Sequence, residues 1–276
     1  MSLATHLQAL KARYDHPEAL AMDPLARVLA HPDPADRELV AWVGATLAYG
    51  KVAPMLRAIQ AGLAPLGDRP AAWLRDRTSD QAGRALRKAL RGWAWRFHTA
   101  EDLVQWLLLW RHLDAEGGLQ EAFRPGPGET ADEALSRLMQ RLRGELPDSY
   151  GLRFSLTDPL EGGACKRWRM FLRWMVRPGW PDLGQWDALR PADLIIPVDT
   201  HVARTARFIG LSTRSTADGR MAEEITATLR RICPEDPLSF DFALSHLGIL
   251  GDCPGLRHRT TCRPCPLYKV CRAGKR

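Results

Sequence analysis

The spacing of apolar and polar positions along this chain is predominantly that of amphipathic helices. Apolar residues recur three and four positions apart from residue 2 to the region before the C-terminal cysteines, and no stretch alternates as a strand does. The periodic stretches predict helices over residues 36–50, 55–63, 79–95, 101–113 and 129–142, the first starting at Asp36 and stopped by Gly50. We therefore predict an all-α fold.

Other stretches are irregular or too short to span a membrane. A turn is expected at residues 124–128 and an irregular connection over residues 143–163. The longest apolar run, residues 104–110, is too short to cross a bilayer, and the first twenty residues lack the apolar core of a secretory signal. We expect a cytoplasmic protein whose ten tryptophans lie mostly in its core.

One predicted helix combines an apolar stripe with a basic face. The stripe consists of Trp168, Phe171, Leu172 and Met175, and the opposite side carries Lys166, Arg173 and Arg177 with Arg167 and Arg169 at the flanks. The helix follows a Gly-Gly-Ala-Cys turn, and the positive end of a helix disfavours an ammonium group. Lys166 is therefore either a lysine that deprotonates readily or the outermost member of a solvated basic face.

A second segment places a carboxylate at a helix start. The apolar run over residues 194–198 leads into Asp199, after which Val202, Ala206 and Ile209 form a core stripe that Gly210 ends. Asp199 is well placed to cap this helix, and capping alone would explain it. A capping carboxylate is also held ionised in a fixed orientation, so it can stabilise positive charge that develops nearby.

The net charge of +7 is concentrated at the C-terminal end. Residues 253–276 include seven basic side chains and no acidic one, whereas the remainder of the chain is balanced. Such a surface suits a polyanion such as nucleic acid, because neutralised phosphates release counterions. A solvated basic tail is the alternative interpretation.

The same segment holds four of the six cysteines, namely Cys253, Cys262, Cys265 and Cys271. Four thiolates this close in sequence indicate either an iron–sulfur cluster or tetrahedral zinc, and the spacing does not choose between them. Disulfides are not expected in a cytoplasmic protein of this size. Cys165 and Cys233 stand alone and are interpreted as small core residues.

The order of these features resembles the helix-hairpin-helix DNA glycosylase superfamily, especially its endonuclease III branch, which has an iron–sulfur loop. Residues 162–166 lie over the family's hairpin and catalytic lysine, residues 198–201 over the motif with the catalytic aspartate, and the four cysteines over the [4Fe-4S] loop. Glu161 and Ala164 depart from the usual Pro-Gly-x-Gly hairpin. The long connection from Lys166 to Asp199 is more similar to archaeal 8-oxoguanine glycosylases.

The resemblance implies two helical lobes with a helix-hairpin-helix element and a C-terminal cluster loop. Residues 36–180 would form a central barrel lobe that includes the hairpin, and residues 1–35 with 181–276 would form the second lobe. The implied activity is that of a base-excision repair glycosylase with AP lyase activity, which removes an oxidised base through a Schiff base on Lys166 assisted by Asp199. The implied partner is duplex DNA with a damaged base or abasic site, bound by a nucleoid-associated monomer.

The resemblance also implies a set of DNA contacts and a cofactor. The [4Fe-4S] cluster would be held by the four C-terminal cysteines, and DNA would be contacted by Gly162, Gly163, Arg167, His201, Arg257, Arg259 and Arg263. Two other classes stay open: a non-catalytic iron–sulfur protein that binds DNA as a damage sensor or architectural factor, and a zinc-containing nucleic-acid-binding module. In each class we expect binding to weaken steeply as salt concentration rises.

Overall fold

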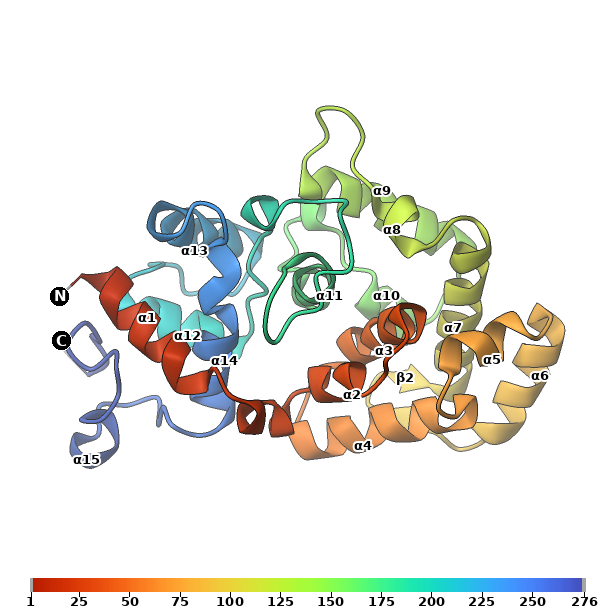
Figure 1. Ribbon diagram of the computed structural model, residues 1–276, viewed down its shortest axis with the longest axis horizontal. Helices are drawn as coiled ribbons and strands as arrows, with labels where there is room; N and C mark the ends of the chain where they lie inside the picture. The colour runs from red at the N-terminus through yellow and green to blue at the C-terminus, as the bar shows by residue number, and fades with distance from the viewer. Residues whose placement is uncertain (1, 275–276) are drawn as a thin grey trace. The chain divides into compact units, whose positions relative to one another are not determined.

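The computed structural model describes residues 2–274 and is built almost entirely of helices (Figure 1). Within these residues the sheet structure is one antiparallel pair of two-residue strands, β1 (Ala94–Trp95) and β2 (His98–Thr99). The predicted all-α fold class is confirmed at this level. No helix in the described part of the chain is long and apolar enough to cross a membrane.

The chain divides into two compact units that interleave in sequence. The first comprises Met1–Met22, Gly162–Arg173 and Arg190–Arg276, and the second comprises Asp23–Glu161 and Trp174–Leu189. These bounds differ from those of the predicted lobes, because the turn at residues 162–165 groups with the C-terminal part of the chain. Helix α11 (Lys166–Val176) begins in the first unit and ends in the second.

The second unit is organised around α3 (Pro34–Leu47), whose C-terminal two-thirds are buried. The indole rings of Trp42 on α3 and Trp106 on α7 stack 4.4 Å apart at 17°. The prediction that most tryptophans are core residues is confirmed, since Trp42, Trp106, Trp110, Trp168, Trp174 and Trp186 are buried. The helices of this unit are α2 (Leu25–Leu29), α3 (Pro34–Leu47), α4 (Val52–Leu63), α5 (Pro70–Arg75), α6 (Ser79–Ala89), α7 (Ala100–Ala115), α8 (Leu119–Phe123), α9 (Ala131–Glu145) and α10 (Tyr150–Ser155), with short 3-10 turns η2 (Ala64–Leu66) and η3 (Pro159–Glu161).

Several predictions for this unit are wrong, including the stop at Gly50, because α3 ends at Leu47. Helix α3 is capped by Asp33 rather than Asp36, because Pro34 fits the first helical position and the Asp33 carboxylate accepts the Ala35 N–H at 2.8 Å. The Asp36 carboxylate is buried and accepts the Ala71 N–H instead, also at 2.8 Å. Helix α6 ends before the β1–β2 hairpin rather than at residue 95, and the connection expected to be irregular contains α10.

The first unit is organised around α14 (Asp241–Ile249), which packs against α1 (Leu3–Tyr14) and α12 (Thr200–Ile209) (Figure 1). The predicted stripe of Val202, Ala206 and Ile209 on α12 is buried. Gly210 ends α12 in the left-handed conformation with φ at 75°, as predicted. The elements of this unit are α1 (Leu3–Tyr14), η1 (Pro17–Met22), the start of α11, η4 (Pro191–Asp193), α12 (Thr200–Ile209), α13 (Gly219–Ile232), η5 (Pro237–Phe240), α14 (Asp241–Ile249) and α15 (Arg259–Cys262).

The structure agrees with the prediction for the apolar face of α11 but not with a solvated basic face. Its predicted apolar stripe is buried throughout. The alternative of a solvated basic face is wrong, because Arg169, Arg173 and Arg177 are each at most 5% exposed. Arg173 pairs with Asp241 in the first unit, and Arg177 pairs with Asp182 in the second. A guanidinium tolerates burial only when a carboxylate or other acceptor compensates its charge, and here the tertiary structure supplies one.

Candidate functional site

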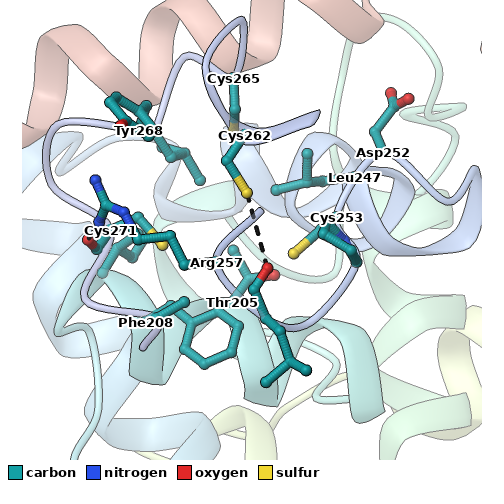
Figure 2. Close-up of a pocket in the computed structure, with 15 residues that line it drawn as sticks. Thr205, Phe208, Leu247, Asp252, Cys253, Arg257, Cys262, Cys265, Tyr268 and Cys271 are labelled. Atoms are coloured by element: carbon teal, nitrogen blue, oxygen red, sulfur yellow. Dashed lines mark hydrogen bonds between the residues drawn. The ribbon is translucent and has the colours of Figure 1, made fainter. Parts of the chain in front are cut away.

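The four C-terminal cysteines line one pocket of the first unit (Figure 2). Its volume of about 490 Å³ includes space open to solvent, and its remaining lining is mainly apolar, with Phe208 and Leu247 among the walls. Figure 2 shows the thiol groups directed from different sides toward the same space. As they stand, no three His, Cys, Asp or Glu side chains of residues 2–274 are grouped so as to hold one metal ion.

Backbone hydrogen bonds place each thiol-bearing residue. The Cys253 N–H donates to the Leu247 carbonyl at 2.8 Å, which ties the start of the loop to α14. The Cys265 N–H donates to the Cys262 carbonyl at 3.0 Å, and the Cys271 N–H donates to the Leu267 carbonyl at 2.8 Å. These hydrogen bonds hold turns of the segment that bring Cys253, Cys265 and Cys271 to the same pocket.

One basic side chain lines this pocket, and others lie exposed on the same segment. Arg257 lies over the ring of Tyr268, with 4.5 Å from Cζ to the ring centroid, and donates to the Cys271 carbonyl at 3.1 Å. Its hydrogen bond to Tyr268 raises the pKa of Arg257. Arg259 and Arg263 are exposed. Burial raises the pKa of the Cys265 thiol.

Helix α1, near the N-terminus, contacts the C-terminal cysteine segment. The Tyr14 hydroxyl donates to Asp252, next to Cys253, at 2.6 Å, and Arg13 pairs with the same carboxylate at 3.1 Å. Burial and this hydrogen bond raise the pKa of Tyr14 above its usual value. Nδ1 of His6 lies 2.8 Å from the Pro266 carbonyl oxygen. The apolar spacing from residue 2 onward indicates helical structure in this region but carries no signal of its partner.

The turn before α11 packs against the start of α13. Gly162 has φ at +85°, and its carbonyl accepts the Gly219 N–H at 3.2 Å. A side chain at Gly219 would approach the Gly163 carbonyl oxygen to 3.1 Å, so α13 starts in close contact with the turn. Cys165 follows with φ at +46°, a region that L-residues rarely adopt, and it is buried as predicted.

The structure places Lys166 at the first residue of α11, half-buried like its neighbour Arg167. The first turn of α11 contains no acidic side chain. Asp199 caps α12 as predicted, and one carboxylate oxygen accepts the N–H groups of His201 and Val202 at 2.8 and 2.7 Å. Asp199 is half-buried. Lys166 and Asp199 thus lie at two helix N-termini of one compact unit.

His201 packs against α14, at the glycine in position 248. A side chain on Gly248 would come within 2.2 Å of the His201 ring, so this position accepts only glycine without a shift. One turn further along α12, Arg204 lies beside the cysteine segment, 3.5 Å from the Cys253 carbonyl oxygen, and Thr205 lines the pocket. Neither Arg204 nor Thr205 was predicted to lie at this pocket, although both belong to the helix that Asp199 caps.

A family model described as a protein of unknown function, DUF2400, matches residues 23–250 of the chain. The chain belongs to the DUF2400 family. The DUF2400 match includes α11 and α12 and ends just before Cys253, so α1 and the four-cysteine segment lie outside it. No curated protein matches the chain.

Membership of DUF2400 corrects the family assignment made from the sequence. The assignment to the helix-hairpin-helix DNA glycosylase superfamily is wrong, because the family model that spans most of the chain is DUF2400. Short motifs carried that assignment, and local structure accounts for several of them: Asp199 caps α12, and the glycine turn seats α13. Since DUF2400 is defined without a function, the chemistry must be argued from the residues themselves.

Proposed function

We propose that this protein binds duplex DNA and excises an oxidised base, as a DNA glycosylase with associated AP lyase activity. The observation that carries the proposal is the placement of a lysine and a carboxylate at two helix N-termini of one unit, the unit that also contains the four-thiol pocket. Lys166 would be the nucleophile and Asp199 the electrostatic partner. The proposal rests on these groups and not on family membership.

The position of Lys166 supports its role as a nucleophile. The amide dipoles at the start of α11 disfavour an ammonium group. Half-burial next to Arg167 acts in the same direction. A neutral amine is the form that attacks carbon, so this environment favours covalent catalysis.

The position of Asp199 supports its role as a fixed anion. Two backbone N–H groups hold the same carboxylate oxygen, which leaves the second oxygen of the carboxylate for other partners. Hydrogen bonds to the ionised form stabilise the anion. A preorganised negative charge of this kind lowers the energy of a sugar cation as it forms.

The reaction follows from these two groups. The Lys166 Nζ would form a bond to C1′ of the damaged nucleotide as the glycosidic C–N bond breaks, and the base would leave with a proton. Opening of the sugar ring then gives a Schiff base between Lys166 and C1′. Loss of a C2′ proton expels the 3′ phosphate by β-elimination, and hydrolysis returns the free amine. The target nucleotide must leave the base stack for this attack.

Two parts of the first unit would contact DNA: the turn before α11 and the C-terminal cysteine segment. The turn at residues 162–165 would act as the hairpin of a helix-hairpin-helix element and offer the amides of Gly162 and Gly163 to a phosphate. Arg167 and His201 would extend this contact. At the C-terminal end, Arg257, Arg259 and Arg263 are exposed and would bind phosphates.

The four-thiol pocket fits a [4Fe-4S] cluster. The donor set is four cysteines around one mainly apolar space, and cationic Arg257 and Arg204 lie near enough to offset thiolate charge. When bound, the cluster would act as a structural crosslink of the C-terminal segment and would hold its arginines in place. Cys253, Cys262, Cys265 and Cys271 would be its ligands.

Borohydride trapping on a lesion panel tests the catalytic proposal. Duplexes that carry an oxidised purine, an oxidised pyrimidine or an abasic site are incubated with the protein and reduced. We expect a covalent adduct that Lys166→Ala abolishes and that Lys88→Ala, an exposed lysine on α6, leaves unchanged. Asp199→Asn keeps the cap and should slow trapping at least tenfold. DNA binding without an adduct on any lesion contradicts catalysis and leaves a non-catalytic DNA-binding protein.

Metal analysis tests the cofactor separately. We expect about four iron atoms per chain and visible absorption, both lost in Cys262→Ser and retained in Cys233→Ser, whose thiol lies outside the pocket. One zinc atom per chain without visible absorption would instead indicate a zinc module. Affinity for DNA should fall steeply with salt, and replacement of the three exposed arginines by glutamine should reduce the slope by roughly 0.9 for each phosphate that the protein no longer neutralises.

A further inference from the structure

Four aromatic side chains of the second unit gather at the β1–β2 hairpin. The rings of Tyr49 and Phe97 are nearly parallel, 5.8 Å apart at 9°, while Phe154 and Tyr150 meet Phe97 edge-on at 4.9 and 5.2 Å. They come from the turn after α3, the hairpin and α10. Phe97 is 37% exposed and Tyr150 is 61% exposed. This aromatic platform is therefore open to solvent, unlike the tryptophan core of the same unit.

Hydrogen bonds below the rings hold the aromatic platform in place. The Tyr49 hydroxyl donates to the Trp95 carbonyl at 2.9 Å and lies 2.6 Å from Nδ1 of His98. Nε2 of His98 lies 2.7 Å from the Ser155 hydroxyl of α10. A side chain at Gly151 would come within 2.5 Å of the Phe97 carbonyl oxygen, so α10 packs closely on the hairpin. A ligand on these rings would lose little free energy in ordering them.

A strained arginine lies at the tip of this hairpin. Arg96 has φ at +50°, a conformation that usually falls to glycine or asparagine and costs an arginine backbone energy. Its guanidinium carbon lies 5.5 Å from the Phe97 ring centroid and 5.9 Å from that of Tyr49. The side chain also packs on Gly50, next to exposed Lys51. One cation thus adjoins the exposed rings, and a second exposed cation, Lys51, follows Gly50 in the chain.

We propose that this aromatic platform binds an unpaired nucleobase of DNA, which stacks on the face of Tyr150 and meets Phe97 edge-on, while Arg96 and Lys51 contact the adjoining phosphate. Aromatic faces and arginine planes are the surfaces on which unpaired bases stack, and cations beside them match the nucleotide's own charge. The strain retained at Arg96 is explained if its side chain serves a ligand. The inference rests on the proposed function only in taking DNA as the ligand.

Binding of single-stranded and bulged DNA tests this inference. A fluorescein-labelled 15-nucleotide strand and a duplex with one unpaired 2-aminopurine are titrated with wild-type protein and variants. We expect Tyr150→Ala to weaken binding of both probes about 5- to 150-fold, the range for one lost base stack. Phe97→Ala, which removes the edge-on contact, should weaken binding of both probes more than about twofold. Both variants should also relieve the quenching of 2-aminopurine. Tyr150→Phe keeps the ring and should bind within twofold of wild type.

Arg96→Gly separates the role of the side chain from the stability of the fold. The substitution relieves the positive φ, so the melting temperature should rise, whereas DNA affinity should fall severalfold. Arg84→Gln, which removes an exposed charge from α6, should change neither quantity. Opposite changes in stability and affinity at one position cannot result from partial unfolding.

The outcomes distinguish this inference from the proposed function. If wild-type protein forms the borohydride adduct but the ring variants bind both probes within twofold of wild type, the inference is overturned and the glycosylase proposal stands. If no adduct forms but the ring variants lose single-strand binding, the inference stands without the catalytic proposal. Unchanged DNA affinity together with abolished self-association in Phe97→Ala would overturn the inference in favour of a protein interface.

Discussion

The buried ion pair between Arg173 and Asp241 makes a sharp prediction about stability. Both side chains are almost fully excluded from water, at 4% and 2% exposure. Removal of one member of such a pair leaves a buried charge without compensation, which costs about 3–5 kcal/mol. For Asp241→Asn, which keeps the shape and one acceptor oxygen, we expect a loss of about 3 kcal/mol. At about 2–4 °C per kcal/mol, the melting temperature should fall by about 6–12 °C.

Thermal unfolding monitored by tryptophan fluorescence measures this loss. Asp33→Asn is the matched control, because it makes the same chemical change at an exposed helix cap where asparagine serves equally well. The double variant Arg173→Met with Asp241→Leu removes both charges and should recover most of the stability lost in Asp241→Asn. A melting temperature within 2 °C of wild type for Asp241→Asn would refute the reasoning, as would a double variant less stable than the single one.

Three further predictions concern other buried polar groups. Asp36→Ala should cost about 1–3 kcal/mol in urea unfolding, because it leaves the buried Ala71 N–H without its acceptor; an unchanged midpoint would contradict this. Burial raises the pKa of Glu38, and the Trp186 and Trp110 N–H groups that donate to its carboxylate oppose part of this effect. The group therefore stabilises the fold below its unfolded pKa, and this contribution is lost as pH rises through the folded value. Between pH 4 and pH 8 the wild type should lose more stability than Glu38→Gln, and parallel stability curves would argue against this. Tyr14→Phe removes a hydrogen bond to the Asp252 carboxylate and should lower stability by about 1.5 kcal/mol. Cysteine alkylation in metal-free protein should also become severalfold faster. An unchanged alkylation rate would show that α1 does not restrain the cysteine segment.

The helical elements and several of their ends follow from local patterns along the chain. Apolar spacing depends on which residues lie one turn apart, and that relation is local, so the core stripes of α11 and α12 could be read directly. The cap at Asp199 and the stop at Gly210 are likewise local, because each acts on backbone groups within one turn. Four cysteines close in sequence could be expected to meet, and they line one pocket.

Local pattern misled where two residues competed for one role. Asp33 and Asp36 both suit a helix start, and Pro34 decided in favour of Asp33. The Asp36 carboxylate instead accepts a hydrogen bond from a backbone N–H group of α5. The same limit explains the family assignment, since a glycine turn, a capping aspartate and a cysteine loop are each short and each has a local structural use.

Which polar groups are buried and which aromatic groups stay exposed depends instead on contacts between distant segments. Arg173 looked solvated because its partner, Asp241, lies 68 residues away. The anchoring of the cysteine segment by Tyr14 joins residues 238 positions apart. The aromatic platform unites Tyr49, Phe97 and Tyr150 from three separate segments. Such contacts depend on how elements pack rather than on neighbours within a turn, so no pattern along the chain encodes them directly.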